Sequence, residues 1–283
     1  MNKPFFRRLL SALGSLFLGR WRCPHGGPER REEPLGQREA SLEDEDEGIL
    51  PGASVAFEEL GPQAIPVLQT ALRSDDWEVR AKAVGLLEKL GPEAMPIVVR
   101  TLRDENKYVR MAAIRALRRV APKARGAMPE LDEALHDESP EVRLSAVVCL
   151  GGIGAAAIPR LVAAIRDDDL TVRTRAVRAL GRTGPEAVPA LEKALGSEDF
   201  RIRSKAAEAL GNIGRKATAA VPALVKALDD QESLVRAWAA KALGQIGGKA
   251  EAAVPALIKA RRDGELLVRA WALEALRKIK RRQ

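Results

Sequence analysis

The chain has 283 residues, of which 46% are hydrophobic, 30% are charged and only 4% are aromatic. Two cysteines, Cys23 and Cys149, exclude a disulfide scaffold, and two histidines are too few for a histidine-rich metal site. No apolar run reaches the roughly 18 residues of an ordinary membrane span. A core of Ala, Val, Leu and Ile with so few rings favours closely packed helices over a β-sandwich.

Charge is distributed unevenly along the chain. Residues 1–60 carry 8 Lys or Arg against 11 Asp or Glu, whereas the rest of the chain carries 39 basic and 28 acidic residues. The net charge of +8 therefore comes entirely from residues 61–283. A basic body favours acidic partners in general, but it does not choose among them.

The first 22 residues form a basic and apolar segment, residues 1–22. Its apolar stretch, Leu9 to Gly19, has 11 residues, which is too short to span a bilayer but suits a signal peptide or an interfacial helix. Arg and Trp follow it instead of a small-residue cleavage site. We therefore prefer membrane-surface contact through residues 5–21, or a partner-binding helix, over cleavage. Secretion and a misassigned start codon stay as alternatives.

Residues 23–48 have the composition of a disordered linker. They are rich in Pro and Gly and end in the acidic run Glu43–Glu47. Cys23 and His25 lie in this segment, but two ligands are fewer than the four of a structural zinc site. We predict no metal here.

From residue 62 onward the sequence repeats. Seven prolines are separated by 30 or 33 residues, and an arginine stands 14 residues after each of them. The prolines are Pro66, Pro96, Pro129, Pro159, Pro189, Pro222 and Pro255. The arginines are Arg80, Arg110, Arg143, Arg173, Arg203, Arg236 and Arg269. Such a period indicates stacked helical units, each of which buries its apolar face against the next.

Each repeat contains two predicted helices. The proline lies in the first turn of the first helix, where its missing N–H costs nothing. Eight residues later comes a residue that favours helix N-caps, so the second helix is expected to begin there or shortly after. These residues are Ser74, Asp104, Asp137, Asp167, Ser197, Asp230 and Asp263. In the middle and later repeats the second helix should end at a glycine, as at Gly184 and Gly214.

Three features resemble HEAT repeats, specifically the short repeats of the phycobilisome-lyase type. They are the Ala-Val/Ile-Pro-x-Leu opening, the turn from Asp167 to Arg173, and the Ala-Leu-Gly-x-Ile-Gly ending. The resemblance covers about residues 62–280. It implies an all-α fold, a right-handed α-solenoid of about seven helical hairpins, with the second helices lining the concave face.

The expected solenoid domain is residues 49–283. Its half-repeat 49–60 is followed by repeats 62–91, 92–121, 122–154, 155–184, 185–214, 215–247 and 248–283. Arg261 replaces the apolar residue found at Leu228, and Lys280 replaces the terminal glycine. These polar substitutions are typical of a capping repeat.

The seven repeat arginines are interpreted as a structural ladder. An Asp six residues earlier, at the expected helix N-cap, offers each guanidinium a carboxylate or a carbonyl, in its own turn or in the neighbouring one. The resemblance to HEAT repeats implies the same role.

Residues that would indicate catalysis are missing from the chain. Deoxyhypusine hydroxylase resembles this architecture and holds two irons with His-Glu motifs, but no His-Glu dipeptide occurs here. No nucleophile elbow, P-loop or dinucleotide-binding motif is present. Cys149 stands where other repeats have Ala179 or Ala209, so we expect a small core residue. We predict no catalytic residue, no metal and no cofactor.

The candidate binding residues lie on the expected concave face. At the 21 positions two, five and nine residues after the ladder arginines, ten residues are basic and two are acidic. The basic candidates are Lys82, Arg115, Arg119, Arg175, Arg178, Arg182, Lys205 and Lys241. Two apolar pairs at i, i+4 spacing adjoin them: Leu234 with Trp238, and Leu267 with Trp271. A solvated charged face, with indoles that pack on each other, is the alternative.

We therefore predict a non-catalytic scaffold that binds an acidic protein partner, with the Trp/Leu pairs as anchors. One alternative is an enzyme-associated protein of the phycobilin-lyase or oxidoreductase-like HEAT group. Another is nucleic-acid binding, which the low aromatic content and the scattered basic residues disfavour. The expected location is cytoplasmic, with peripheral membrane contact as an option.

Overall fold

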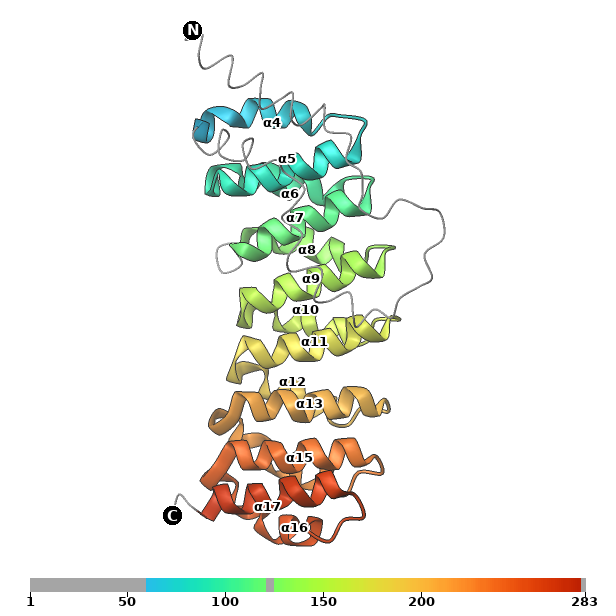
Figure 1. Cartoon of the computed structure of the whole chain (residues 1–283), viewed down its shortest axis with the longest axis vertical. Helices are drawn as coiled ribbons and strands as arrows, with labels where there is room; N and C mark the ends of the chain where they lie inside the picture. The colour runs from blue at the N-terminus through green and yellow to red at the C-terminus, as the bar shows by residue number, and fades with distance from the viewer. Residues whose placement is uncertain (1–59, 121–124, 281–283) are drawn as a thin grey trace. The chain divides into compact units, whose positions relative to one another are not determined.

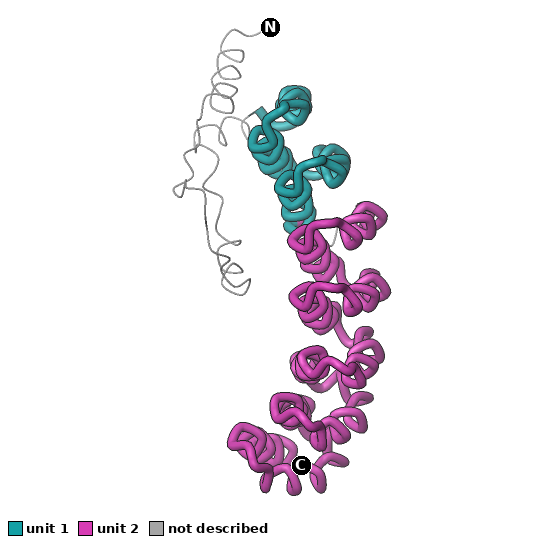
Figure 2. Tube along the Cα trace, turned by 90° about the vertical axis from the view of Figure 1, so that its right-hand side faces the viewer, with its two compact units in different colours: residues 1–119 teal, residues 120–283 magenta. Residues whose placement is uncertain are grey.

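The computed structural model describes residues 60–120 and 125–280. The predicted segments 1–22 and 23–48, and the half-repeat 49–60 apart from Leu60, lie outside the described residues. Within the described ranges every element is helical and no strand occurs. The chain falls into two compact units, residues 1–119 and 120–283 (Figure 2).

Unit 1 contains two helical hairpins. Its elements are η1 (Gly61–Ala64), α4 (Ile65–Ala71), α5 (Trp77–Lys89), η2 (Pro92–Ala94), α6 (Met95–Arg100), η3 (Thr101–Arg103) and α7 (Lys107–Arg119). The short first helices are α4 and α6, and the longer second helices are α5 and α7, which pack against each other.

Unit 2 contains five helical hairpins (Figure 1). Its first helices are α8 (Met128–Ala134), α10 (Ile158–Ala164), α12 (Val188–Ala194), α14 (Val221–Ala227) and α16 (Val254–Ala260). Its second helices are α9 (Pro140–Ile153), α11 (Leu170–Thr183), α13 (Phe200–Ile213), α15 (Ser233–Ile246) and α17 (Leu266–Lys280). The 3₁₀ helices η5 (Ala155–Ala157), η6 (Pro185–Ala187), η7 (Gly214–Ala220) and η8 (Gly247–Ala253) connect the hairpins. Each second helix packs on the next one, and together they line the inner side of the unit's curve (Figure 2). This is an α-solenoid, as predicted.

The repeat prolines lie in the first turns of helices, and the repeat glycines end helices, as the sequence predicted. Pro189, for example, lies in the first turn of α12. Helices α9, α11, α13 and α15 each end at a glycine with a positive φ, as at Gly184 with φ 111°. The longer period of two repeats has a local cause, because η7 and η8 have seven residues where η5 and η6 have three.

The predicted N-cap residues have a different role. Helix α15 begins at Ser233, three residues after Asp230, and its N-cap position is Glu232. The Asp230 carboxylate instead accepts the backbone N–H of Glu232 at 2.9 Å and so closes a turn before the helix. Asp199 is one of the residues whose side chain does cap a second helix, α13. The N-cap positions were therefore predicted two residues too early in the chain.

Small residues allow the second helices to approach closely. Ala83, Ala146 and Ala206 are fully buried, and the side chain of Cys149 is buried as predicted. A Cβ added at Gly181 would lie 2.8 Å from the Cβ of Ala209 on the next helix. Glycines at the same position of α9, α13 and α15 make equally close approaches, so the stacking distance is set by the absent side chains.

The last repeat carries polar residues where earlier repeats are buried, as predicted. Arg261 and Lys280 are exposed, whereas Leu228, which occupies the position of Arg261 one repeat earlier, is buried. Arg277 stands where Gly244 contacts the following helix. An arginine does not permit so close an approach, so α17 differs at this position from the second helices before it.

Candidate binding face

The ladder arginines are bound to their own chain. Arg203 on α13 donates from Nη1 to the carbonyls of Ser197 and Glu198 in its own turn. It donates from Nε and Nη2 to the Asp230 carboxylate in the next repeat, at 2.7 and 2.8 Å. The same bidentate arrangement joins Arg80 to Asp104, Arg143 to Asp167 and Arg236 to Asp263.

The remaining ladder arginines keep the carbonyl contacts. Arg110 and Arg269 each donate from Nη1 to two carbonyls of the preceding turn. Arg173 does the same, but the next repeat has Ser197 where others have Asp, and among the described residues its carboxylate contact is a single one, from Nη2 to Asp199 at 3.4 Å. Within unit 2 the ladder is therefore weakest between α11 and α13.

These contacts alter the ionisation of the ladder groups. The hydrogen bond from Arg236 lowers the pKa of Asp263 despite its burial. For Asp167 and Asp230, burial alone would raise the pKa, but hydrogen bonds from the guanidinium and a backbone N–H outweigh it and lower the pKa. Hydrogen bonding to these carboxylates in turn raises the pKa of Arg143, Arg203 and Arg236. The ladder is thus held in its charged form and serves the fold.

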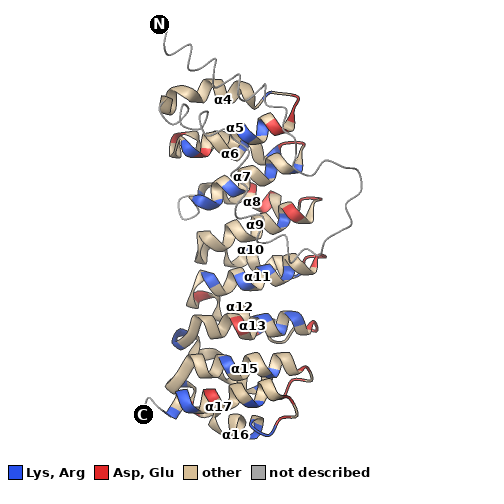
Figure 3. Cartoon of the chain, viewed as in Figure 1, with Lys and Arg blue, Asp and Glu red and all other residues tan. Residues whose placement is uncertain are grey.

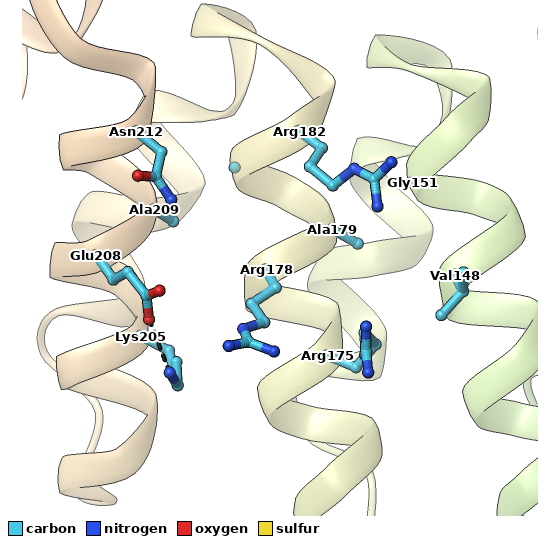
Figure 4. A pocket seen from close by; sticks show the side chains of 11 residues that line it. Val148, Gly151, Arg175, Arg178, Ala179, Arg182, Lys205, Glu208, Ala209 and Asn212 are labelled. Atoms are coloured by element: carbon cyan, nitrogen blue, oxygen red, sulfur yellow. Dashed lines mark hydrogen bonds and ion pairs between the residues drawn. The ribbon is translucent and has the colours of Figure 1, made fainter. Parts of the chain in front are cut away.

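A basic pocket lies on the second-helix face of unit 2. Its volume is about 270 Å³, and it is lined by residues of α9, α11 and α13 (Figure 4). Arg175, Arg178 and Arg182 of α11 stand around it, with Lys205 and Glu208 of α13 on one wall. Figure 3 shows basic positions along α11 and α13 on this face. The structure thus brings together four of the eight predicted basic candidates.

Not every predicted cation is equally available. Lys205 Nζ contacts Glu208 Oε2 at 2.7 Å, so this pair contributes little net charge. Within the described residues, Arg178 and Arg182 have no acidic partner, and both are exposed. The charge of the pocket therefore rests mainly on α11.

Three of the other four basic candidates lie in unit 1, and the fourth, Lys241, lies on α15 of unit 2. Lys82 is on α5, and Arg115 and Arg119 are on α7. Arg119 Nε lies 3.1 Å from Glu88 Oε1, so it too has a partner. Counting charges along the sequence did not reveal which cations are paired, because the pairing depends on side chains of neighbouring helices.

The predicted Trp/Leu pairs do meet on α15 and α17. The rings of Trp238 and Trp271 are in contact, with centroids 5.1 Å apart. Leu234 and Leu267 remain 42% and 47% exposed. Lys241 Nζ lies over both indoles, 4.4 Å and 4.7 Å from their centroids, a contact that the sequence analysis did not foresee. The indoles thus pack on each other, while the two leucines remain open. We call these four residues the Trp/Leu patch.

A second ring pair went unnoticed in the sequence. Trp77 and Tyr108 of unit 1 have ring centroids 4.9 Å apart, and both are exposed. Their positions in the two repeats differ by one residue, so the periodicity gave no signal for the contact.

A family model for HEAT repeats matches the chain in five overlapping segments. These are residues 40–118, 65–135, 95–181, 158–221 and 188–277. The chain belongs to the HEAT-repeat family. The resemblance seen in the sequence is confirmed, and with it a scaffold architecture typical of protein binding and mostly non-catalytic.

Several solved structures are similar to this HEAT-repeat chain. A designed armadillo repeat protein in complex with the peptide (KR)4 is 24% identical, with a TM-score of 0.46, over 65% of this chain and 99% of its own. Human deoxyhypusine hydroxylase in complex with glycerol is 23% identical, with a TM-score of 0.39, over 99% and 98%. The complex of CpcE and CpcF of phycocyanin lyase from Nostoc sp. is 24% identical, with a TM-score of 0.45, over 53% and 98%. A search of curated proteins finds no match.

The described part of this HEAT-repeat chain shows neither a metal-binding cluster nor a membrane-spanning helix. No group of three or more His, Cys, Asp or Glu residues is arranged there to hold a metal ion. None of its helices combines the length and apolar character needed to cross a membrane.

Proposed function

We propose that this HEAT-repeat chain is a non-catalytic scaffold whose second-helix face in unit 2 binds an acidic segment of a partner protein. The observation that carries the proposal is the position of the basic pocket beside the Trp/Leu patch, on consecutive helices of one unit. Lys205, on the wall of the pocket, lies 6.0 Å from the Trp238 ring, so the two regions are continuous.

The charged part of the face supports an acidic occupant. Arg178 and Arg182 project from α11 without an acidic partner among the described residues, and their guanidinium groups are available to carboxylates. Guanidinium groups also accelerate the encounter with an acidic partner through long-range attraction. The ladder arginines are excluded from this role because their donors are used within the chain.

The Trp/Leu patch supports a protein partner over nucleic acid. Exposed leucines beside two indoles in tilted contact offer an apolar anchor, and Trp is a preferred residue at the centre of protein interfaces. Glu208 and Glu274 on the same face are paired with Lys205 and Lys278, so these two lysines contribute little charge toward an extended phosphate backbone. Contact with a membrane surface through residues 5–21 and a cytoplasmic location are kept as proposals that involve the undescribed part of the chain.

The test is binding of the purified full chain to fluorescent peptide libraries, one rich in Asp and Glu and one rich in Lys and Arg. We expect selective binding of acidic peptides that contain Leu, Phe or Trp, with an affinity that falls as salt rises. R178Q/R182Q should weaken binding about tenfold or more. The control R166Q/R215Q removes the same charge from two exposed arginines outside the pocket and should have little effect.

A second pair of variants tests the apolar anchor. L234S/L267S changes two half-exposed side chains of the patch, so we expect a folded chain with binding reduced about tenfold or more. The control L266S alters a neighbouring leucine that is 72% exposed and should leave binding unchanged. Equal binding of acidic and basic libraries, or full binding by both variants, would refute the scaffold proposal.

A further inference from the structure

We propose that the basic pocket between α9, α11 and α13 binds a phosphorylated serine or threonine of the partner segment. The inference rests on the proposed function and specifies the chemistry of its ligand. It also sets a distance along that ligand between the phosphate and an apolar residue that occupies the Trp/Leu patch.

The pocket exists because the helices must pack closely. Its floor is formed by Gly151, Gly181, Ala179 and Ala209, the small residues that allow α9, α11 and α13 to approach. These positions cannot carry larger side chains, since a Cβ at Gly151 would already lie 2.9 Å from that of Ala179. The long side chains of α11 therefore surround residues that have small side chains or none. This difference in side-chain length creates the pocket.

The donors around this floor suit a dianion. Arg175, Arg178 and Arg182 stand on one face of α11 at the spacing of successive turns and line the same pocket. In Figure 4, Arg178 extends toward α13, whereas Arg175 and Arg182 extend toward α9. Each guanidinium offers a planar fork of N–H donors, which matches phosphate oxygens.

The number of charges distinguishes phosphate from carboxylate. A phosphorylated side chain carries about −1.5 to −2 charges and three acceptor oxygens, so it can be shared by two guanidiniums. A single Asp or Glu carries one charge and would balance only one guanidinium. Glu208 does not neutralise them, because its carboxylate is paired with Lys205 at 2.7 Å.

The arrangement of helices sets a spacing along the ligand. The arginines lie on α11 and Trp238 lies on α15, two second helices farther on, with α13 between them. Packed helices are about 8–10 Å apart, so the separation is about 16–20 Å. An extended peptide advances about 3.3 Å per residue, so we expect the apolar residue about five to six positions from the phosphorylated one.

The experiment uses the full chain and three matched peptide libraries. Each library has a central fixed residue, either phosphoserine, Glu or Ser, with degenerate positions on both sides that include acidic residues. We expect the phosphoserine library to bind about tenfold or more tightly than the Glu library. Among bound phosphopeptides, Leu, Phe or Trp should be enriched about five to six positions from the phosphate.

The variants separate the two parts of the inference. R178Q/R182Q should abolish the preference for phosphoserine over Glu, while R166Q/R215Q should retain it. L234S/L267S should remove the apolar enrichment and leave the preference for phosphate intact.

The outcomes also separate this inference from the scaffold proposal. Equal binding of the phosphoserine and Glu libraries would overturn the phosphate site and leave an acidic-peptide scaffold standing. A phosphate preference that survives R178Q/R182Q would overturn the assignment to this pocket. Failure of all three libraries to bind would overturn both proposals.

Discussion

The carboxylate of Asp230 receives the guanidinium of Arg203 from the preceding repeat, with Nε to Oδ2 at 2.7 Å and Nη2 to Oδ1 at 2.8 Å. Both side chains are largely buried, with 16% and 12% of their surface exposed. The backbone carbonyl of Asp230 accepts Nη1 of Arg236 at 2.8 Å. One residue thus links two ladder arginines, and consecutive repeats are joined by polar contacts as well as by apolar packing.

The Asp230→Asn substitution should destabilise unit 2. Asn keeps the turn that its side chain closes but loses the charge that opposes the buried guanidinium of Arg203, so we expect a loss of about 2–4 kcal/mol. The measurement is the midpoint of urea unfolding followed by circular dichroism. The adjacent Asp229→Asn is the control, because its ion pair with Lys259 is exposed and should contribute at most about 1 kcal/mol. Equal effects of the two substitutions would contradict the prediction.

The Ser197→Asp substitution should stabilise the chain. Ser197 stands where an Asp would complete the bidentate contact with Arg173, whose present carboxylate contact is a single one at 3.4 Å. Asp167 and Asp169 already occupy the equivalent two positions one repeat earlier, so the turn accepts both charges. We expect a gain of about 0.5–1.5 kcal/mol, and Ser197→Asn, which lacks the charge, should gain less. No increase in the urea midpoint would count against this account of the ladder.

Stability should fall in acid because of the ladder carboxylates. In the unfolded chain an Asp titrates near its ordinary pKa of about 3.9, whereas the pKa values of Asp167, Asp230 and Asp263 are lowered in the folded chain. The unfolded chain then binds more protons than the folded one. The stabilisation by these carboxylates is therefore complete above the unfolded-state pKa. It is lost as the pH falls from the unfolded-state pKa through the lower pKa values of the folded chain.

The check is a series of urea midpoints from neutral pH to about pH 3. Asp230→Asn removes one of the three titrating groups, so its midpoint should fall less steeply between about pH 5 and 3 than that of the parent chain. Parallel curves for the two proteins would show that Asp230 does not contribute to the acid sensitivity.

The Gly181→Ala substitution should be destabilising, although Ala normally favours a helix over Gly by about 1 kcal/mol. The new Cβ would lie 2.8 Å from the Cβ and 3.2 Å from the Cα of Ala209, so α11 and α13 would have to separate. We expect a net loss of about 1–3 kcal/mol. The double variant G181A/A209G relieves the contact, so its two changes should cost less together than their separate losses predict. Strictly additive losses would argue against close helix packing as the cause.

The sequence predicted the local elements well. The hairpins, the prolines in the first turns and the terminating glycines follow from residues that act on their own backbone, as Gly184 does. It also predicted the close packing, because the core is rich in Ala and poor in aromatic rings. The part that Gly181 has in this packing came from the structure. The same periodicity placed Trp238 and Trp271 on one exposed arc.

The tertiary structure alone decided which distant partner each polar residue has. Asp230 looked like a helix cap because its local pattern fits one, but it serves Arg203, 27 residues away, which no local pattern reports. The basic pocket likewise depends on how three helices place small residues beneath the arginines of α11. Backbone preferences are set by neighbours in the chain, whereas pairing, exposure and pocket shape are set by neighbours in space.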